Sequence, residues 1–286
     1  MENCLVEIPS ENWPELRNLY RNNWPEHVYA YGIVNNYIRW KSSDHSDHLG
    51  VKILSLNGRW RENGTFLLFD DFEIYFYSLD VQTVYQSLTE ALCLVPWESY
   101  SEVSMDFMEQ HRIALDKAIS MRKLNVVQDS ITNFYYISKE NANTLLVERP
   151  VELRFDRISV EYLDYIYNQW ALKESISQSS GYNLLKRLIL LNDSVGLFDE
   201  AGNLVSWCLR DQSGALSDLQ TSEPYFRKGY GRAVVSELAR RLSQLGDDSY
   251  ALVFSSNYKS CRLFEVAGFR KMCHAHWVVV RQMGQS

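Results

Sequence analysis

The chain contains 286 residues, 46% of them hydrophobic and 23% charged, which is typical of a globular protein with one large or two modest domains. Its formal net charge of −7 argues against nucleic acid or an anionic membrane as its main partner. No apolar run approaches the ~20 residues of a membrane-spanning helix, and the N-terminus matches neither a signal peptide nor an Arg-rich presequence.

The cysteines indicate a reducing compartment. The sequence has five, an odd number, and they are widely spaced without a Cys-x-x-Cys pair. This pattern favours free thiols over a disulfide framework or a zinc site. We therefore expect a cytoplasmic protein.

A polar stretch over residues 41–50 contains the run from Asp44 to His48, with two histidines and two aspartates. These residue types bind metals, but no third fixed ligand is evident, so a solvated loop is the favoured interpretation. We expect no metal cofactor.

The first half of the chain alternates between strand and helix spacing, which predicts a mixed α/β unit. A helix is expected over 13–20, and a long strand over 28–40 because that segment is rich in Tyr, Ile and Val. The further expected elements are strands over 51–56, 64–69 and 72–77, helices over 81–95 and 105–121, and a strand over 132–138. The polar segment Asn141–Thr144 is the candidate linker, which divides the chain into domains 1–143 and 144–286.

The pattern of elements starts again after this linker. Ser159 is expected to cap the helix that follows it. The expected elements are a strand over 151–155, helices over 163–170 and 181–191, a hairpin of strands over 194–198 and 204–209, a strand over 215–221, a helix from 233, a strand over 250–255, a helix after 257 and a strand over 277–280.

The turn between the 215–221 strand and the next helix is a candidate phosphate site. Pro224 cannot donate to a sheet, so the strand should end near it. The turn that follows contains Gly229 and Gly231, which allow close backbone approach. The first-turn amides of a helix lack internal partners and attract anions. A basic turn tightened by glycines is the alternative.

Two motifs in this half resemble those of the GNAT acyltransferases. Phe226-x-x-Gly229-x-Gly231 between strand and helix is similar to motif A, whose amides hold the pyrophosphate of coenzyme A. The segment from Asn257 to Phe269 is similar to motif B, and Val205–Gly214 resembles the glycine N-acyltransferase-like family. The resemblance implies an α/β (α+β mixed-sheet) fold with a C-terminal GNAT acyl-CoA acyltransferase domain. The first half would be a degenerate GNAT-like copy without a phosphate loop.

The resemblance also implies which residues bind acyl-CoA. Pantetheine would pair with the 215–221 strand, on which alternation places Asp218 and Gln220 on one face. The expected cofactor-binding residues are Leu219, Gln220, Thr221, Phe226, Arg227, Lys228, Gly229, Tyr230, Gly231, Arg232, Asn257, Ser260 and Phe264. Capping of the next helix is the alternative role for Asn257.

Two positions depart from the family pattern. Phe264 stands where the superfamily has the tyrosine that protonates the thiolate, and Ala215 stands where the glycine N-acyltransferase-like pattern has a glutamate. The nearest carboxylates that could serve as the base are Asp218 and Glu223. For each, a solvated side chain is the alternative. Deprotonating an alkyl ammonium at pH 7 costs roughly 4.6 kcal/mol, so a base matters more than the acid.

We therefore expect an acyl-CoA-dependent N-acyltransferase acting on a small amine or amino acid, with no nucleic-acid or membrane partner. One alternative is a CoA-binding regulatory protein that is catalytically weak or inactive, favoured by Phe264 and Ala215. A protein-modifying acetyltransferase is another. Because relatives with glycine N-acyltransferase activity are mitochondrial, that compartment is the alternative location.

Overall fold

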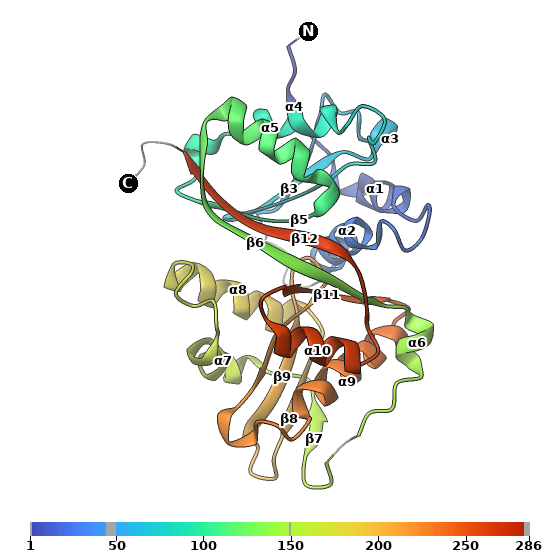
Figure 1. Cartoon of the computed structure of the whole chain (residues 1–286), viewed down its shortest axis with the longest axis vertical. Helices are drawn as coiled ribbons and strands as arrows, with labels where there is room; N and C mark the ends of the chain where they lie inside the picture. The colour runs from blue at the N-terminus through green and yellow to red at the C-terminus, as the bar shows by residue number, and fades with distance from the viewer. Residues whose placement is uncertain (1, 44–49, 149, 283–286) are drawn as a thin grey trace. The chain divides into compact units, whose positions relative to one another are not determined.

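The computed structural model describes residues 2–43, 50–148 and 150–282. They form two compact units: unit 1 contains the chain up to Thr132 and again from Cys273 onward, and unit 2 contains residues 133–272. The long strands β6 (Leu124–Ile137) and β12 (Arg270–Gln282) have residues in both units (Figure 1). The last strand is therefore part of the unit formed by the first half of the chain. The candidate metal loop, Asp44 to His48, lies outside the described residues.

Unit 1 is built on a mixed sheet. The spatial order of its strands is β1 (Leu5–Glu7), β2 (Lys52–Leu56), β3 (Phe66–Asp70), β4 (Glu73–Tyr77), β5 (Val103–Met108), β12 and β6. Its helices are α1 (Trp13–Leu19), α2 (Val28–Lys41), α3 (Trp60–Asn63), α4 (Gln86–Cys93) and α5 (Arg112–Arg122), with 3-10 turns at Ser10–Asn12, Trp97–Ser99 and Glu109–His111. Buried residues of α4 and α5 share one hydrophobic core with the stacked rings of Phe76 and Phe107, whose centroids are 5.1 Å apart.

The predicted strand over 28–40 is wrong, because these residues form α2. Tyr, Ile and Val favour strands mainly through the packing that a sheet provides, so tertiary context overrides that preference. Ten of the 14 residues of the helix are buried, including Ile33, Val34 and even Asn36. A helix buried on most sides lacks the polar face that makes helical spacing visible in a sequence.

The predicted helix over 105–121 is wrong in its first part. Residues up to Met108 belong to β5, and α5 begins only at Arg112. The predicted helix over 81–95 is shortened to α4. Val84 and Tyr85 have φ angles of 52° and 57°, which lie outside the right-handed helical region, so the helix begins after them.

The predicted linker Asn141–Thr144 is also wrong, since most of it lies in the helix α6 (Lys139–Asn143). The Ser138 side chain accepts a 3.3 Å hydrogen bond from the backbone N of Asn141 and caps this helix. Ala142 is fully buried in the core of unit 2. One small apolar residue in a polar segment gave too weak a signal.

Unit 2 contains the elements predicted for the second half in their predicted order, except for the strand over 277–280, which is part of β12 and lies in unit 1. The elements are β7 (Arg154–Asp156), α7 (Leu163–Gln169), α8 (Gln178–Leu191), β8 (Ser194–Phe198), β9 (Leu204–Arg210), β10 (Leu216–Thr221), α9 (Tyr230–Gln244), β11 (Ser249–Phe254) and α10 (Tyr258–Val266), with 3-10 turns at Val160–Tyr162 and Glu223–Tyr225. Ser159 does not cap α7: it precedes the first of these turns, and its hydroxyl donates to Glu161 Oε1 at 2.7 Å.

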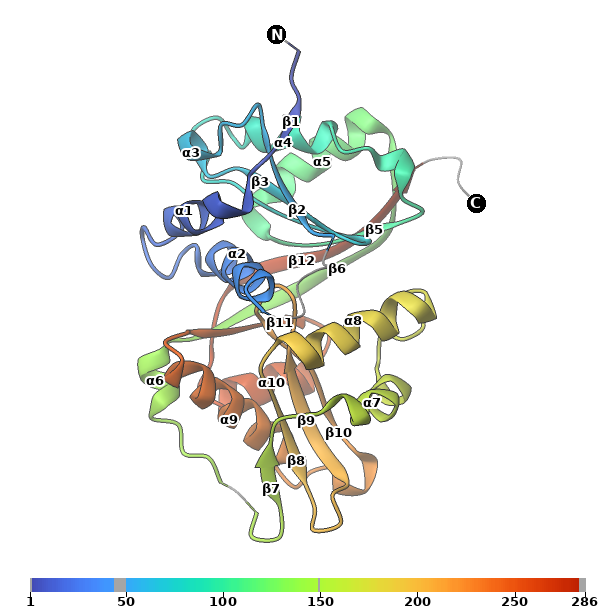
Figure 2. The same ribbon diagram turned by 180° about the vertical axis from the view of Figure 1, so that it is seen from behind.

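Strands β10, β9, β8 and β7 form an antiparallel sheet in that order. Helices α7 and α8 lie on one face and α9 on the other (Figures 1 and 2). The stripe Val234, Val235, Leu238 and Leu242 of α9 is fully buried in the core of this unit. Burial of each such side chain contributes about 1.5–3 kcal/mol to the stability of the fold. The core therefore holds α9 firmly beside the sheet.

Candidate active site

A cavity of about 190 Å³ lies in unit 2 between β10 and β11. Within the described part of the chain, these two strands are not hydrogen-bonded neighbours: β10 ends one sheet, and β11 ends the other beside β6. The gap between them is lined by residues 216–220 of β10, residues 252–254 of β11, Ile166, residues 169–172, Trp207, Asn257, Ser260 and Phe264. Two edge strands therefore form the walls of the cavity.

A β-bulge interrupts β10 inside this cavity. Ser217 pairs with Leu209 and Gln220 with Trp207, so two residues, Asp218 and Leu219, stand opposite one residue of β9. Asp218 has a φ of 48°, which lies in the left-handed region. A bulge bends its strand and redirects a side chain. The strict alternation expected over 215–221 is therefore wrong at the bulge.

The carboxylate of Asp218 accepts two hydrogen bonds in the cavity wall. Trp170 Nε1 donates to Oδ1 at 2.6 Å, and Ser217 Oγ donates to Oδ2 at 3.0 Å. Burial raises the pKa of Asp218, and both hydrogen bonds partly offset this effect by favouring the charged form. Since a raised pKa makes a carboxylate a better proton acceptor near neutral pH, the arrangement suits a general base.

Trp170 reaches this position from the end of α7, because a glycine leaves space for its ring. A Cβ atom at Gly181 in α8 would lie 2.8 Å from Cζ3 of Trp170. The indole is 9% exposed, so its orientation is set by packing. Trp170 and Trp207 line the cavity, but sequence analysis did not identify either as a site residue. The sequence predicted that Trp170 lies at the end of a helix over 163–170. It could not predict the contact with Asp218, which is 48 residues away along the chain.

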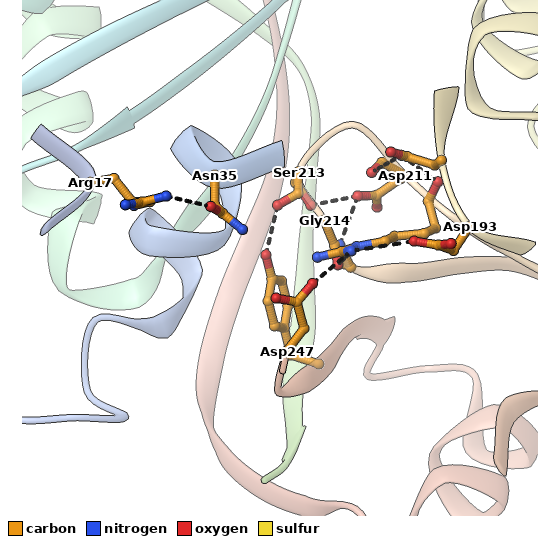
Figure 3. A network of polar contacts seen from close by, with 11 residues as sticks. Arg17, Asn35, Asp193, Asp211, Ser213, Gly214 and Asp247 are labelled. Carbon is orange, nitrogen blue, oxygen red and sulfur yellow. Dashed lines mark hydrogen bonds and ion pairs between the residues drawn. The ribbon is translucent and has the colours of Figure 1, made fainter. Parts of the chain in front are cut away.

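A second aspartate lies in the turn between β9 and β10. Asp211 Oδ1 accepts hydrogen bonds from Ser213 Oγ at 2.6 Å and from the backbone N of Ala215 at 3.0 Å (Figure 3). Burial raises the pKa of Asp211 to about 6, and the charge of Asp218 adds to the effect. Asp211 shapes the turn that leads into β10.

Arg210 anchors the same turn. This buried guanidinium donates from Nε to the carbonyl of Gly214 at 3.0 Å and from Nη1 to Asp247 Oδ2, also at 3.0 Å (Figure 3). A buried charge is expensive unless it is paired, so the bond to Asp247 compensates this burial. The turn is thereby fixed to the segment before β11.

The glycine turn leads directly into α9. Gly229 is the N-cap with a φ of 80°, and none of the described side chains caps this end. The amides of Tyr230, Gly231 and Arg232 precede the first internal bond, which runs from Ala233 N to Gly229 O. A Cβ atom at Gly229 would meet no described atom within 4 Å, so its open side is free for a ligand. This is the geometry of a helix-terminus anion site.

The charged side chains of this turn lie at the surface. Arg227 and Lys228 are exposed, and Lys228 Nζ lies 5.2 Å from the centroid of the Tyr225 ring. Arg232 is partly buried and forms a 3.2 Å ion pair with Glu148. Phe226 is 53% exposed. Arg227, Lys228 and Arg232 therefore add positive charge beside the first-turn amides of α9.

The residues of the second motif lie at the start of α10, on the other side of the cavity. Asn257 Oδ1 accepts a 3.1 Å hydrogen bond from the backbone N of Ser260, so Asn257 is the N-cap of this helix and also lines the cavity. Phe264 lines the cavity as well, although it is only 3% exposed. Its ring stacks on Tyr135 at 5.9 Å and meets Phe269 edge-on at 5.1 Å.

The structure separates the two candidate bases. Asp218 lines the cavity, while Glu223 is exposed in the 3-10 turn after β10 and is not among the residues that line it. Ala215 is 1% exposed. Of the predicted cofactor-binding residues, Leu219, Gln220, Asn257, Ser260 and Phe264 line the cavity. Thr221 ends β10 and is not among the lining residues, and residues 226–232 span the turn after the strand and the start of α9.

Among residues 2–43, 50–148 and 150–282, no three His, Cys, Asp or Glu side chains gather closely enough to hold a metal ion. Over these same ranges, every helix is too short or too polar to cross a bilayer.

Solved structures identify the fold. A Drosophila protein is similar over 98% of this chain and 99% of its own, with a TM-score of 0.84 and 19% identity. A tandem GNAT protein from the clavulanic acid biosynthesis pathway covers 98% of both chains with a TM-score of 0.57 and 9% identity. A GCN5-related N-acetyltransferase from Sphaerobacter thermophilus covers 97% of this chain and 94% of its own, at 0.53 and 13%. The chain therefore has a two-half GNAT fold, as the sequence predicted.

The sequence also matches one family description. Residues 194–278 match the FR47-like protein family. The match runs from β8 into β12 and therefore includes the glycine turn, the bulged strand and α10. The family match therefore covers the two strands that form the walls of the cavity, and the structural likenesses show a GNAT fold.

Proposed function

We propose that this protein is an acyl-CoA-dependent N-acyltransferase that acts on a small amine. One observation carries the proposal: the bulge inside β10 and the glycine turn that follows this strand place a carboxylate and a helix N-terminus along the same segment of chain. The bulge presents a partly buried carboxylate in the cavity, and the far end leads into a helix N-terminus open to an anion. A thioester bound along this strand would have its phosphates at the turn and its acyl group beside Asp218.

The residues present fit coenzyme A. The first-turn amides of α9 would bind the pyrophosphate at the open side of Gly229, and Arg227 and Lys228 would supply charge. The outer edge of β10, interrupted at Asp218, would accept the extended pantetheine arm by strand-like pairing. Asn257 and Ser260 line the opposite wall, where the arm ends.

The transfer requires loss of a proton from the amine. Asp218 takes the proton from the ammonium, directly or through a water molecule, and the freed lone pair attacks the thioester carbonyl carbon. The carbon–sulfur bond then breaks and the nitrogen loses its second proton to water, giving a neutral amide and the CoA thiolate. Trp170 and Ser217 hold the carboxylate in place during this step.

The departing thiolate takes its proton from water in this scheme. Phe264 occupies the wall of the cavity but carries no hydroxyl. Because a thiol pKa of about 8.5 lies only ~1.5 units above neutrality, the absence of an acid forfeits at most ~2 kcal/mol. The nearby hydroxyl of Tyr258 is not placed to supply this proton, because Tyr258 is 79% exposed and is not among the residues that line the cavity.

The second candidate function is a CoA-binding regulatory protein. Phe264 is the observation that favours it, because the ring is packed between Tyr135 and Phe269 where the superfamily has an acid. Both functions predict binding of acyl-CoA, so binding cannot separate them. Amide formation separates them.

The test combines a binding arm and a turnover arm. In calorimetry, acetyl-CoA should bind the full chain, and saturation at 100 times the dissociation constant should stabilise the fold by about 2.7 kcal/mol. Thiol release from acetyl-CoA is then followed with a panel of primary amines. Binding with turnover supports the transferase, binding without turnover supports the regulator, and absence of binding overturns both.

A further inference from the structure

We propose that unit 1 contains a binding site of its own for an amino acid with a basic side chain. The site is a second cavity, with a volume of about 250 Å³, and the residues that line it all belong to unit 1. It shares no lining residue with the cavity between β10 and β11. The inference therefore does not depend on the proposed acyltransferase function.

The wall of this second cavity is polar. It is formed by Asn3, by the segment from the end of β2 through α3, and by the segment that leads into α4. Leu56 and Trp60 contribute apolar surface, and the other lining residues have amide, hydroxyl or charged side chains. Because such groups are stable away from water only with hydrogen-bonding partners, the wall suits a polar ligand.

The carboxylate of Glu90 is held in a fixed orientation in this wall. Asn3 Nδ2 donates to its Oε2 at 2.9 Å, and Gln86 Nε2 donates to its Oε1 at 2.8 Å. Asn57 Nδ2 in turn donates to Asn3 Oδ1 at 2.9 Å. Each carboxylate oxygen has two lone pairs, so each can accept a further bond from a ligand. The amide network therefore orients Glu90 and leaves it able to bind an ammonium group.

Two opposite charges at α3 are available to a ligand. Arg59 precedes this helix, Glu62 lies within it, and both line the cavity. Within the part of the chain that the structure describes, neither side chain has a hydrogen-bonded or ion-paired partner. The neighbouring Arg61 differs, because it forms a 2.7 Å ion pair with Glu15.

The backbone is unusual in two segments of the wall. Asn57 and Val84 both have a φ of 52°, in the left-handed region. Asn57 lines the cavity, and Val84 directly follows the lining residue Thr83. This conformation is rare for a β-branched residue such as Val84. Strained residues of this kind concentrate at ligand-binding sites, so the backbone is an independent indication that the cavity binds a ligand.

The charges of the wall define the ligand. Glu62 and Glu90 attract two cationic groups, and Arg59 attracts a carboxylate, which a guanidinium binds through two parallel hydrogen bonds. An amino acid with a basic side chain has this set of groups: an α-ammonium, a side-chain cation and an α-carboxylate. A cavity of about 150 Å³ accommodates benzene, so the larger volume here has room for the extended chain of lysine.

The experiment measures the binding of lysine to the full chain by calorimetry, together with two analogues that each lack one charge. Norleucine lacks the side-chain ammonium, and cadaverine lacks the carboxylate. Because hydrogen bonds between charged groups are among the strongest in proteins, each analogue should bind at least about tenfold more weakly than lysine. Absence of lysine binding, or equal binding of either analogue, overturns the inference.

Variants assign the binding to this cavity. Glu90→Gln and Glu62→Gln each remove one negative charge, and each should lower the affinity for lysine about tenfold. Glu11→Gln removes the same charge from an exposed position outside the cavity and should leave the affinity unchanged. Arg59→Glu should reverse the preference, so that cadaverine binds more tightly than lysine. If Glu90→Gln fails to fold, the exposed positions Glu62 and Arg59 decide, and an unchanged lysine affinity in these folded variants overturns the inference.

A further variant separates this site from the cavity in unit 2. Lysine is itself an amine, so it also belongs to the class of acceptors proposed for Asp218. The binding that Glu62→Gln weakens should be unchanged in Asp218→Asn. Binding that is lost in Asp218→Asn but complete in Glu62→Gln assigns lysine to unit 2 and overturns the inference. Acetyl-CoA binding is measured separately, and its absence refutes the proposed function while lysine binding with this pattern still supports the second site.

Discussion

The indole Nε1 of Trp170 donates a 2.6 Å hydrogen bond to Oδ1 of Asp218, which joins the end of α7 to the bulge in β10. The bond fixes a carboxylate whose backbone already has an unusual φ of 48°. It also stabilises the charged form of that carboxylate against the effect of burial. Trp170 is therefore a positioning residue: it orients the carboxylate of Asp218, and it also lowers the pKa of that carboxylate.

Trp170→Phe keeps an aromatic ring and removes the donor. Hydrogen bonds to charged groups contribute about 1.5–3 kcal/mol, so kcat should fall by about tenfold or more. Burial raises the pKa of Asp218 and the indole lowers it, so removing the indole should raise the pKa further. Activity is lost as pH falls through this pKa, and the acid limb of the kcat/KM profile should therefore move to higher pH. Tyr167→Phe, which changes a ring packed 6.4 Å from Trp170, is the control. An unmoved acid limb would remove Trp170 from this role.

Gly229→Val should weaken acyl-CoA binding by at least tenfold, because the new side chain would occupy the open side of the α9 N-terminus. Gly246 provides a matched control at the other end of the same helix: its φ is 87°, and a Cβ there also meets no described atom within 4 Å. Both variants carry a backbone cost of about 1–2 kcal/mol. Calorimetry with acetyl-CoA should separate them, and an equal affinity in the two variants would contradict the anion site.

Phe264→Tyr restores the hydroxyl that the superfamily has at this position. Because Phe264 lines the cavity, the added oxygen should reach solvent or the sulfur, and turnover should hold or rise, most visibly below pH 8. Denaturant unfolding gives the necessary check on the fold. A loss of stability above about 2 kcal/mol would mean that the ring edge is sealed in the core with Tyr135 and Phe269, where an unpaired hydroxyl is costly.

Asp211 should make the stability of the protein depend on pH. Its pKa is about 6 in the folded state against 3.8 for the free side chain, so the folded state holds the proton more tightly. Because the folded state holds this proton more tightly, Asp211 contributes stability to the fold. That contribution is fully present below pH 3.8 and is lost as pH rises to about 6. Urea unfolding across this pH range should show that the free energy of unfolding of the wild type falls as pH rises. The same measurement on Asp211→Asn should show a smaller fall. Parallel curves would exclude Asp211 as the cause.

The motifs predicted the local parts of the site well. Gly229 and Gly231 occupy the start of α9 as expected, since strand, turn and helix follow one another within 30 residues of sequence. The bulge was not predictable, because one extra residue in β10 is visible only against its partner β9. The bond between Trp170 and Asp218 likewise depends on tertiary packing. Sequence spacing could identify both residues as buried or polar but could not bring them together.

The errors in the first half have a common physical cause. In α2 the burial of residues such as Ile33 and Val34 on several sides leaves no polar stripe, and β-favouring residues then indicate a strand. In α6 one buried alanine decides the structure of a polar segment. In each case the neighbouring elements in space determine the conformation. Sequence patterns are informative where one face of an element meets solvent, as in α9.

The irregularity of β10 also bears on solubility. An exposed sheet edge offers a row of free amide and carbonyl groups to any passing extended chain, and regular edges of this kind lead proteins to associate. The two residues at Asp218 and Leu219 put that row out of step with a normal strand. Another protein's strand therefore cannot add along β10 in continuous register, whereas a short, flexible ligand arm can bind on either side of the break. The residue that displays the carboxylate thus also keeps this open edge from becoming a template for aggregation.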